Sequence, residues 1–174
     1  MKVEISGIDA LIRKLEAKKD SLEDKKRLFM ERLAQIGYNT AFVEFSNAEY
    51  DGTNDVVVTA PEWVNEDTIA VKANGSSVLF IEFGAGIRFP EHPLSDEFGY
   101  HHGTYGKGQG ANPKGWVYKG DPGTGGMPIT DRQGKVKDGV YRTFGNPPAR
   151  AMYEAGKQMR ENMLKIAAEV FGND

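Results

Sequence analysis

Residues 68–84 read TIAVKANGSSVLFIEFG, and the expected fold is built around them. Two runs rich in β-branched and apolar side chains, residues 68–73 and 78–83, flank Asn74-Gly75. Because asparagine and glycine tolerate positive φ, this pair favours a tight turn between antiparallel strands. A further β-branched run at residues 56–59 extends the prediction to a small antiparallel meander.

Two helices are expected before this sheet. Apolar residues spaced by three and four from Ile8 to Leu15 predict a short amphipathic helix that begins near residue 7. Ser21, followed by Asp24, provides a second capping signal. Beyond it an apolar stripe opposite a polar side predicts a longer helix that ends near Phe45.

A third helix is predicted after residue 145. Asn146 is a candidate cap, and Pro147 suits the first turn. Gly172 is expected to end the helix. Its apolar stripe consists of Met152, Ala155, Met159, Met163, Ile166 and Val170. Methionine at this spacing suits a core or a subunit-facing surface.

The segment between sheet and last helix differs in kind, because residues 84–146 hold 15 of the 21 glycines and many aromatics. Strand-like runs at residues 116–119 and 140–143 can pair as an extended hairpin. We therefore expect one α+β domain over residues 1–174, with N-terminal helices and a C-terminal helix packed on a small antiparallel sheet. Residues 85–145 are expected to form an extended loop or hairpin insertion.

Composition narrows the range of partners. With 22 Lys and Arg against 25 Asp and Glu, the chain has no strong positive field, so we expect no direct sequence-specific nucleic-acid binding. The absence of cysteine excludes disulfides and thiolate zinc sites. No apolar run reaches the length of a signal peptide or a membrane span, so the expectation is a soluble cytosolic product without a membrane partner.

The sequence contains few residues that could form a metal, nucleotide or catalytic site. His92, His101 and His102, with Asp96 and Glu97, have the ligand types that zinc prefers, but not the spacing of a known site. The glycine-rich run at residues 103–110 lacks the Gly-Lys-Ser/Thr sequence and the helix that a phosphate loop requires. No Gly-x-Ser-x-Gly nucleophile motif is present. We therefore predict no catalytic residue, no cofactor and no metal, with the histidines as polar loop residues at an interface.

Three short motifs recur in a known order and spacing. They are SGID at residues 6–9 with Leu11 and Leu15, FIEFG at residues 80–84, and GNPPARAM at residues 145–152. Together they resemble the head-tail joining and tail-component proteins of long-tailed bacteriophages and prophages. The likeness covers both ends and the central sheet, while residues 85–140 look like an insertion seen in a subset of members.

The resemblance implies a non-enzymatic virion protein that forms a ring, six-fold in the family, at the junction of neck and tail. It implies partners among copies of itself and among connector and tail proteins, and a location in the virion, with assembly in the host cytoplasm. It assigns structural roles to Glu82 and its neighbours at the end of a strand. Interface residues are expected at Phe83, Gly84, Tyr100, Tyr105, Trp116, Tyr118, Pro147, Pro148 and Met152.

Other functions stay open from the sequence. One is a tail terminator or an adaptor that binds a single partner through the insertion without forming a ring. Another, of a different class, is a metal-dependent hydrolase that uses the histidines and acidic residues of the insertion. The sequence leaves open the number of copies in a ring and the side on which it would dock.

Overall fold

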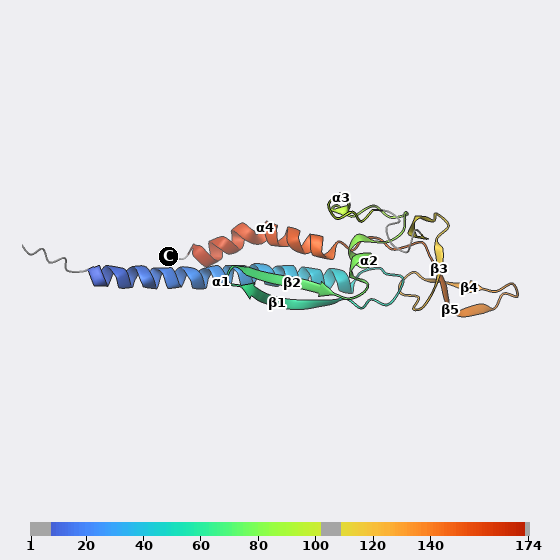
Figure 1. Ribbon diagram of the computed structural model, residues 1–174, viewed down its shortest axis with the longest axis horizontal. Helices are drawn as coiled ribbons and strands as arrows, with labels where there is room; N and C mark the ends of the chain where they lie inside the picture. Colours follow the sequence, from blue (N-terminus) through green and yellow to red (C-terminus); the bar gives the residue numbers. More distant parts are fainter. Residues whose placement is uncertain (1–7, 102–108, 173–174) are drawn as a thin grey trace, which may run out of the picture.

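The computed structural model describes residues 8–101 and 109–172 and confirms an α+β fold. Its helices are α1 (Ile8–Ser46), α2 (Val78–Phe83), α3 (Ser95–Phe98), the 3-10 turn η1 (Gln109–Ala111) and α4 (Ala151–Phe171). Its strands are β1 (Val57–Asn65), β2 (Thr68–Asn74), β3 (Trp116–Lys119), β4 (Met127–Thr130) and β5 (Val136–Thr143). Helices α1 and α4 lie side by side, the β1–β2 pair covers another side of α1, and the remaining strands lie at the far end (Figure 1).

Helix α1 is one continuous helix, so the prediction of two helices before the sheet was wrong. Its 39 residues give a length of about 58 Å at 1.5 Å per residue. The reason lies between Leu15 and Leu22, where no proline or glycine interrupts the chain. Ser21 therefore lies inside the helix instead of capping a new one. No helix in the described residues is both long and apolar enough to cross a membrane.

The hairpin joins β1 to β2 through Glu66 and Asp67, so the turn predicted at Asn74-Gly75 is misplaced. Strand β1 runs well past the expected residues 56–59 and pairs antiparallel with β2. A register shift separates the pair Thr59 and Lys72 from the next pair. That irregularity surrounds Pro61, which has no amide hydrogen to give to the ladder.

Residues 78–83 form helix α2 and not the predicted third strand. The carboxylate of Asp55 accepts the backbone N–H groups of Ser76 at 2.8 Å and of Ser77 at 2.9 Å, and thereby bends the chain away from β2. The following run buries Ile81 and Glu82 as neighbours on one side of a short helix. A short apolar run fits a buried helix as well as a strand, which is why the pattern misled.

The main core lies where α1, α2 and α4 meet. Its buried members are Ala41, Phe45, Ile81, Ala151 and Ala155. Partly buried side chains from the β1–β2 hairpin, including Val58 and Ala73, pack against this cluster. Small residues are prominent because α1 and α4 approach closely.

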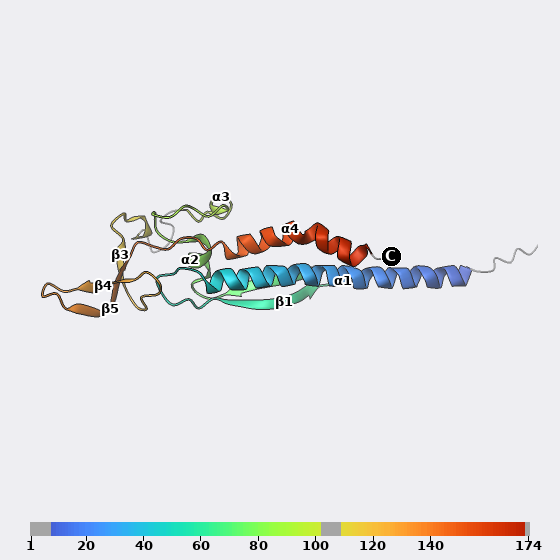
Figure 2. The same ribbon diagram turned by 180° about the vertical axis from the view of Figure 1, so that it is seen from behind.

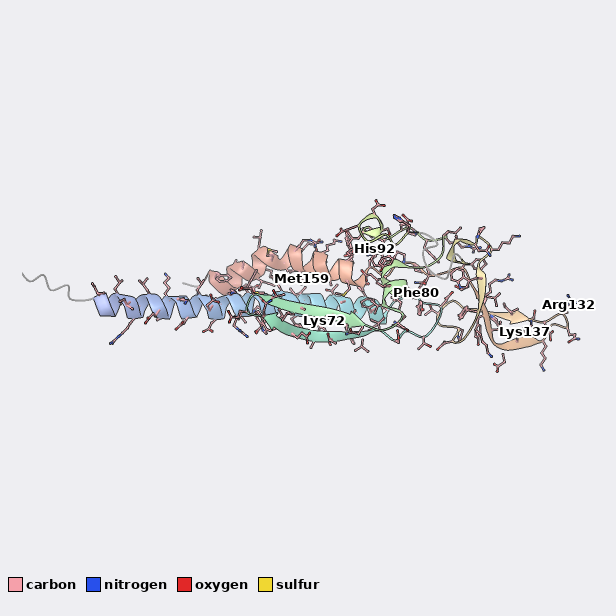
Figure 3. The ribbon with its side chains drawn as sticks, in the orientation of Figure 1. Lys72, Phe80, His92, Arg132, Lys137 and Met159 are labelled. Carbon is pink, nitrogen blue, oxygen red and sulfur yellow. The ribbon has the colours of Figure 1, made fainter. Side chains whose placement is uncertain are left out.

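A second region of packing follows α1 and α4 away from that core. A Cβ atom at Gly37 would lie 2.8 Å from Sδ of Met159, so the glycine leaves room for the methionine (Figure 3). Phe29 and Phe171 hold the end of α4 against α1, with ring centroids 5.8 Å apart. Gly172 follows α4 directly, as predicted.

Residues 85–145 carry their own small sheet. The predicted pairing of residues 116–119 with residues 140–143 is confirmed, since β3 and β5 are antiparallel with Trp116 opposite Thr143. Strand β4, which was not predicted, pairs with the other edge of β5. The β4–β5 turn reaches the end of the molecule, where Arg132 and Lys137 lie (Figure 3).

Candidate functional site

The two motifs at residues 80–84 and 145–152 lie against each other. Ala85 and Asn146 form an antiparallel bridge, with reciprocal N–H to O distances of 3.0 and 3.1 Å. The N–H of Ala149 donates to the carbonyl of Ile81 at 2.8 Å. Asn146, which is 3% exposed, donates from Nδ2 to the carbonyl of Phe80 at 3.0 Å. Asn146 is therefore a bridge between two segments, and its predicted role as the helix cap was wrong.

Glu82 caps the last helix from a distance in sequence. Its Oε2 accepts the N–H of Met152 at 2.9 Å, and its Oε1 accepts the N–H of Tyr153 at 3.1 Å. The first N–H groups of a helix lack partners within the helix and favour a negative charge. Glu82 is only 5% exposed, so α4 begins at Ala151 on a buried carboxylate supplied by α2.

Backbone geometry also marks this junction. Arg150, directly before α4, has φ 58°, and it is the one residue other than glycine with positive φ among those described. Gly84 closes α2 with φ 77°, and a Cβ there would lie 2.7 Å from the nitrogen of Pro148. Gly84 therefore permits both the turn out of α2 and the close passage of the second motif.

His92 extends the junction into the insertion (Figure 3). Its Nδ1 accepts the N–H of Leu94 at 3.0 Å, which places the ring proton on Nε2 in the neutral form. Nε2 lies 3.3 Å from Oε1 of Glu82, outside hydrogen-bond geometry. Burial lowers the pKa of His92, the Arg150 charge lowers it further, and Glu82 opposes both. His92 is therefore neutral at pH 7.

Three surface hollows meet around Asn146. The first is lined by Phe83, Gly84, Tyr100 and Pro148, among others. The second has a volume of about 520 Å³ and is lined by Asp51, Arg88, Phe144 and Pro147, among others. The third has a volume of about 200 Å³ and is lined by Tyr50, Asp51, Phe80, Trp116 and Tyr118, among others. Asn146 lines all three.

The third hollow combines aromatic walls with one carboxylate. The hydroxyl of Tyr118 donates to the backbone carbonyl of Asp121, 3.0 Å away. Burial, reinforced by the nearby carboxylates of Asp51 and Asp121, raises the pKa of Tyr118 to about 12. Asp51 accepts the hydroxyl of Thr143. Aromatic faces around a carboxylate suit an apolar or cationic side chain of another protein.

The structure distributes the predicted interface residues over these hollows. Phe83 and Tyr100 pack with ring centroids 4.6 Å apart, and Trp116 and Tyr118 come together in the third hollow. Met152 instead packs on the core. Tyr105 lies outside the described residues. Whether any of them meets a partner stays a prediction.

Sequence reasoning missed Asn146 as a bridge and Asp51 as the carboxylate of the third hollow. Asp51 lies in a short polar stretch between α1 and β1 that has no motif of its own. Only its packing against β5, about 90 residues later, gives it a role. No local signal in the sequence predicts such a contact.

The two histidines that the structure describes have different partners. His92 faces Glu82, whereas Nδ1 of His101 lies 3.7 Å from Glu91 and 3.9 Å from Asp96. His102 lies outside the described residues, as does most of the run at residues 103–110. Within the described part of the chain, no three His, Asp or Glu side chains are placed to hold a metal ion.

Searches against protein-family models, curated proteins and solved structures found no match to this chain.

Proposed function

We propose that this chain is a structural protein of a tailed phage or prophage particle. It acts in head-tail joining or tail completion, and it does so by assembling into a ring of copies of itself. The proposal takes its biological setting from the three sequence motifs, and its mechanism from the surfaces that the fold leaves open.

The supporting observation is the mutual contact of the second and third motifs. Sixty residues of insertion separate them in sequence, yet Glu82 of one fixes the first turn of the helix that begins in the other. Gly84 and Pro148 pass each other at close range. The two motifs thus form a single structural unit.

This unit also supplies a surface for assembly. The three hollows share Asn146, and large apolar side chains on α2, α3, β3 and β4 are 41 to 54% exposed. They are Leu79, Phe98, Val117 and Met127. Aromatic hollows beside exposed apolar side chains are typical of protein-protein contact sites.

The shape of the molecule suits a head-to-tail contact. The chain is long and narrow, with the start of α1 at one end and the β4–β5 turn at the other (Figure 2). A contact that forms a ring requires a neighbour to meet the hollows with a different part of its own surface. Such heterologous contacts close into rings when the rotation between neighbours permits.

The test is the oligomeric state of the full chain. Size exclusion with light scattering over a range of concentrations, followed by negative-stain imaging, should show oligomers of ring shape. Trp116→Ala should raise the concentration needed for assembly by about tenfold or more, since aromatic anchors dominate such contacts. Trp63→Ala is the matched control, because Trp63 lies on β1 and donates to Glu31 of the same chain.

Both variants must keep a cooperative melting transition for the comparison to count. A chain that stays monomeric at every concentration contradicts the proposal. Rings that form equally well with Trp116→Ala would place the contact outside the third hollow. A monomer that loses a single binding partner when the hollow is altered would favour the adaptor function.

A further inference from the structure

The first part of α1 projects beyond the rest of the protein. Helix α4 ends against Phe29, and Arg32 pairs with Glu169 one turn further on at 3.1 Å. Figures 1 and 2 both show α1 continuing past that point. All described side chains of residues 8–24 are exposed. We call residues 8–24 the overhang.

The overhang repeats the apolar pattern of the packed part of α1. Apolar side chains recur every seven residues at Ile8, Leu15, Leu22, Phe29 and Ile36. Phe29 contacts the end of α4, and Ile36 lies beside Ile166 of α4. Side chains spaced seven residues apart drift by only about 20° per repeat around a straight helix, so this line of side chains stays on one side of α1 over these turns. Phe29 and Ile36 of this line pack on α4, and Ile8, Leu15 and Leu22 continue it along the overhang, where α4 does not cover them.

The uncovered part is strongly apolar. Ile8, Leu11, Ile12, Leu15 and Leu22 are between 45 and 60% exposed. Leu11 and Ile12 lie next to the line at the spacing of a coiled-coil seam. Five large aliphatic side chains lie along one side of the projecting helix, and Lys18 and Lys19 interrupt them between Leu15 and Leu22. Exposed apolar side chains in such a stripe are typical of a binding surface.

The overhang as a whole holds five acidic and four basic side chains, but the charged side chains nearest its apolar line are basic. Lys18 and Lys19 are three and four residues after Leu15, so they border the line on both sides between Leu15 and Leu22. Lys14 lies on the same side as Lys18. A helix that packs here with its own apolar line would place its border residues next to these ammonium groups, and Asp or Glu side chains would satisfy them.

A second copy of this chain fits less well. Parallel pairing in register would set Lys18 and Lys19 beside the same lysines of the other copy. Antiparallel pairing with Glu16 of both copies at the centre would set Lys18 of one copy opposite Lys14 of the other. Either arrangement places like charges together at the middle of the stripe, which costs stability.

We propose that the overhang binds an amphipathic helix of another protein, whose apolar seven-residue line is bordered by acidic side chains. The new helix would continue the packing that α4 ends at Phe29. The proposal does not depend on ring formation, because the elements that line the hollows, including α2 and β3, lie well away from the overhang along the molecule (Figure 1).

The test uses the full chain and two synthetic helical peptides. Both have leucine at the two seam positions of each heptad, one with glutamate and the other with lysine at the border positions. Fluorescence anisotropy in about 0.1 M salt should show binding of the acidic peptide and at least tenfold weaker binding of the basic one. The acidic peptide should bind more weakly at higher salt, where the charges are screened.

Variants locate the contact. Leu15→Asp with Leu22→Asp should weaken binding of the acidic peptide at least tenfold. Lys18→Glu with Lys19→Glu should reverse the preference between the peptides. Asp20→Asn, on the other side of the helix, is the control and should change nothing. All the altered side chains are exposed, so each variant should keep the melting temperature of the parent chain.

Three results would overturn the proposal. The first is equal binding of the two peptides, or binding of neither. The second is acidic-peptide binding that survives the double leucine change. The third is a parent chain that dimerises and becomes monomeric with Leu15→Asp and Leu22→Asp, since the stripe would then be covered by a second copy. None of these results would bear on whether rings form through the hollows.

Discussion

Nε2 of His92 lies 3.3 Å from Oε1 of Glu82, and the two side chains are 1% and 7% exposed. The carboxylate already accepts two N–H groups from the first turn of α4. A histidine from the insertion thus lies against an anion that α2 supplies to α4. The relationship ties three separate segments together, and it makes stability at this junction sensitive to both charge and pH.

Replacing Glu82 should loosen the start of α4. Glu82→Gln keeps the shape and one acceptor oxygen but removes the charge. We expect the free energy of unfolding to fall by about 1.5 to 3 kcal/mol, the range for hydrogen bonds to a charged group. Urea denaturation followed by circular dichroism measures it. Glu66→Gln, at the exposed β1–β2 turn, is the control, and equal losses for both variants would contradict the capping role.

His92 should make stability depend on pH. Burial holds its pKa in the folded protein below the ordinary value of 6.5, so the unfolded chain takes up a proton first as pH falls. The unfolded state then binds more protons, and the free energy of unfolding decreases as pH drops below about 6.5. The contribution of neutral His92 is fully present above that value.

His92→Gln removes this proton uptake. The variant should therefore lose less stability than the parent chain between about pH 7 and about pH 5, when both are measured by urea denaturation at each pH. His101→Gln provides the comparison at an exposed histidine. A parent chain and a His92→Gln variant with parallel pH profiles would show that His92 has the same pKa in both states.

Phe45 and Phe42 offer a matched pair on one helix. Phe45 is 2% exposed in the main core, whereas Phe42, three residues earlier, is 51% exposed. Phe45→Ala should lower the free energy of unfolding by about 3 to 5 kcal/mol, since it leaves a cavity. Phe42→Ala should cost less than about 1 kcal/mol. Denaturation midpoints compare the two, and similar losses would mean that the core lies elsewhere.

The sequence predicted the elements whose signal is local and periodic. The apolar stripe of α4 is confirmed at its buried members Ala155, Ile166 and Val170, whereas Met163 is 43% exposed. The end of α4 at Gly172 and the pairing of β3 with β5 are also confirmed. The long helix was recognised but divided in two, because Ser21 has the sequence of a cap and only the absence of a breaker argues against it.

What failed depends on contacts between distant residues. Residues 78–83 have the composition of a strand, but their state is set by Asp55 at one end and by packing against α4 at the other. Asn146 has the sequence of a cap, yet its partners are Phe80 and Ala85. Neither contact leaves a trace in the local pattern, since each joins segments more than 20 residues apart.

Asp55 gives the last prediction. It precedes β1, and its carboxylate accepts the hydroxyl and N–H groups of Ser76 and Ser77, which follow β2. These hydrogen bonds, with Ser77 contributing most, lower the pKa of Asp55 below its ordinary value of 3.8. A carboxyl whose pKa is lowered by folding stabilises the protein above the unfolded value, and that contribution is lost as pH falls toward the folded one.

Asp55→Asn places an amide N–H₂ against these donors, so we expect the melting temperature at pH 7 to fall by a few degrees. The difference from the parent chain should stay constant down to about pH 5 and then shrink below pH 3.8, as the parent loses the same contribution. Asp138→Asn, exposed on β5, is the control for a general change in charge. Because α2 begins where Asp55 ends the hairpin, a melting temperature unchanged by Asp55→Asn would mean that these bonds do not direct residues 78–83 into a helix.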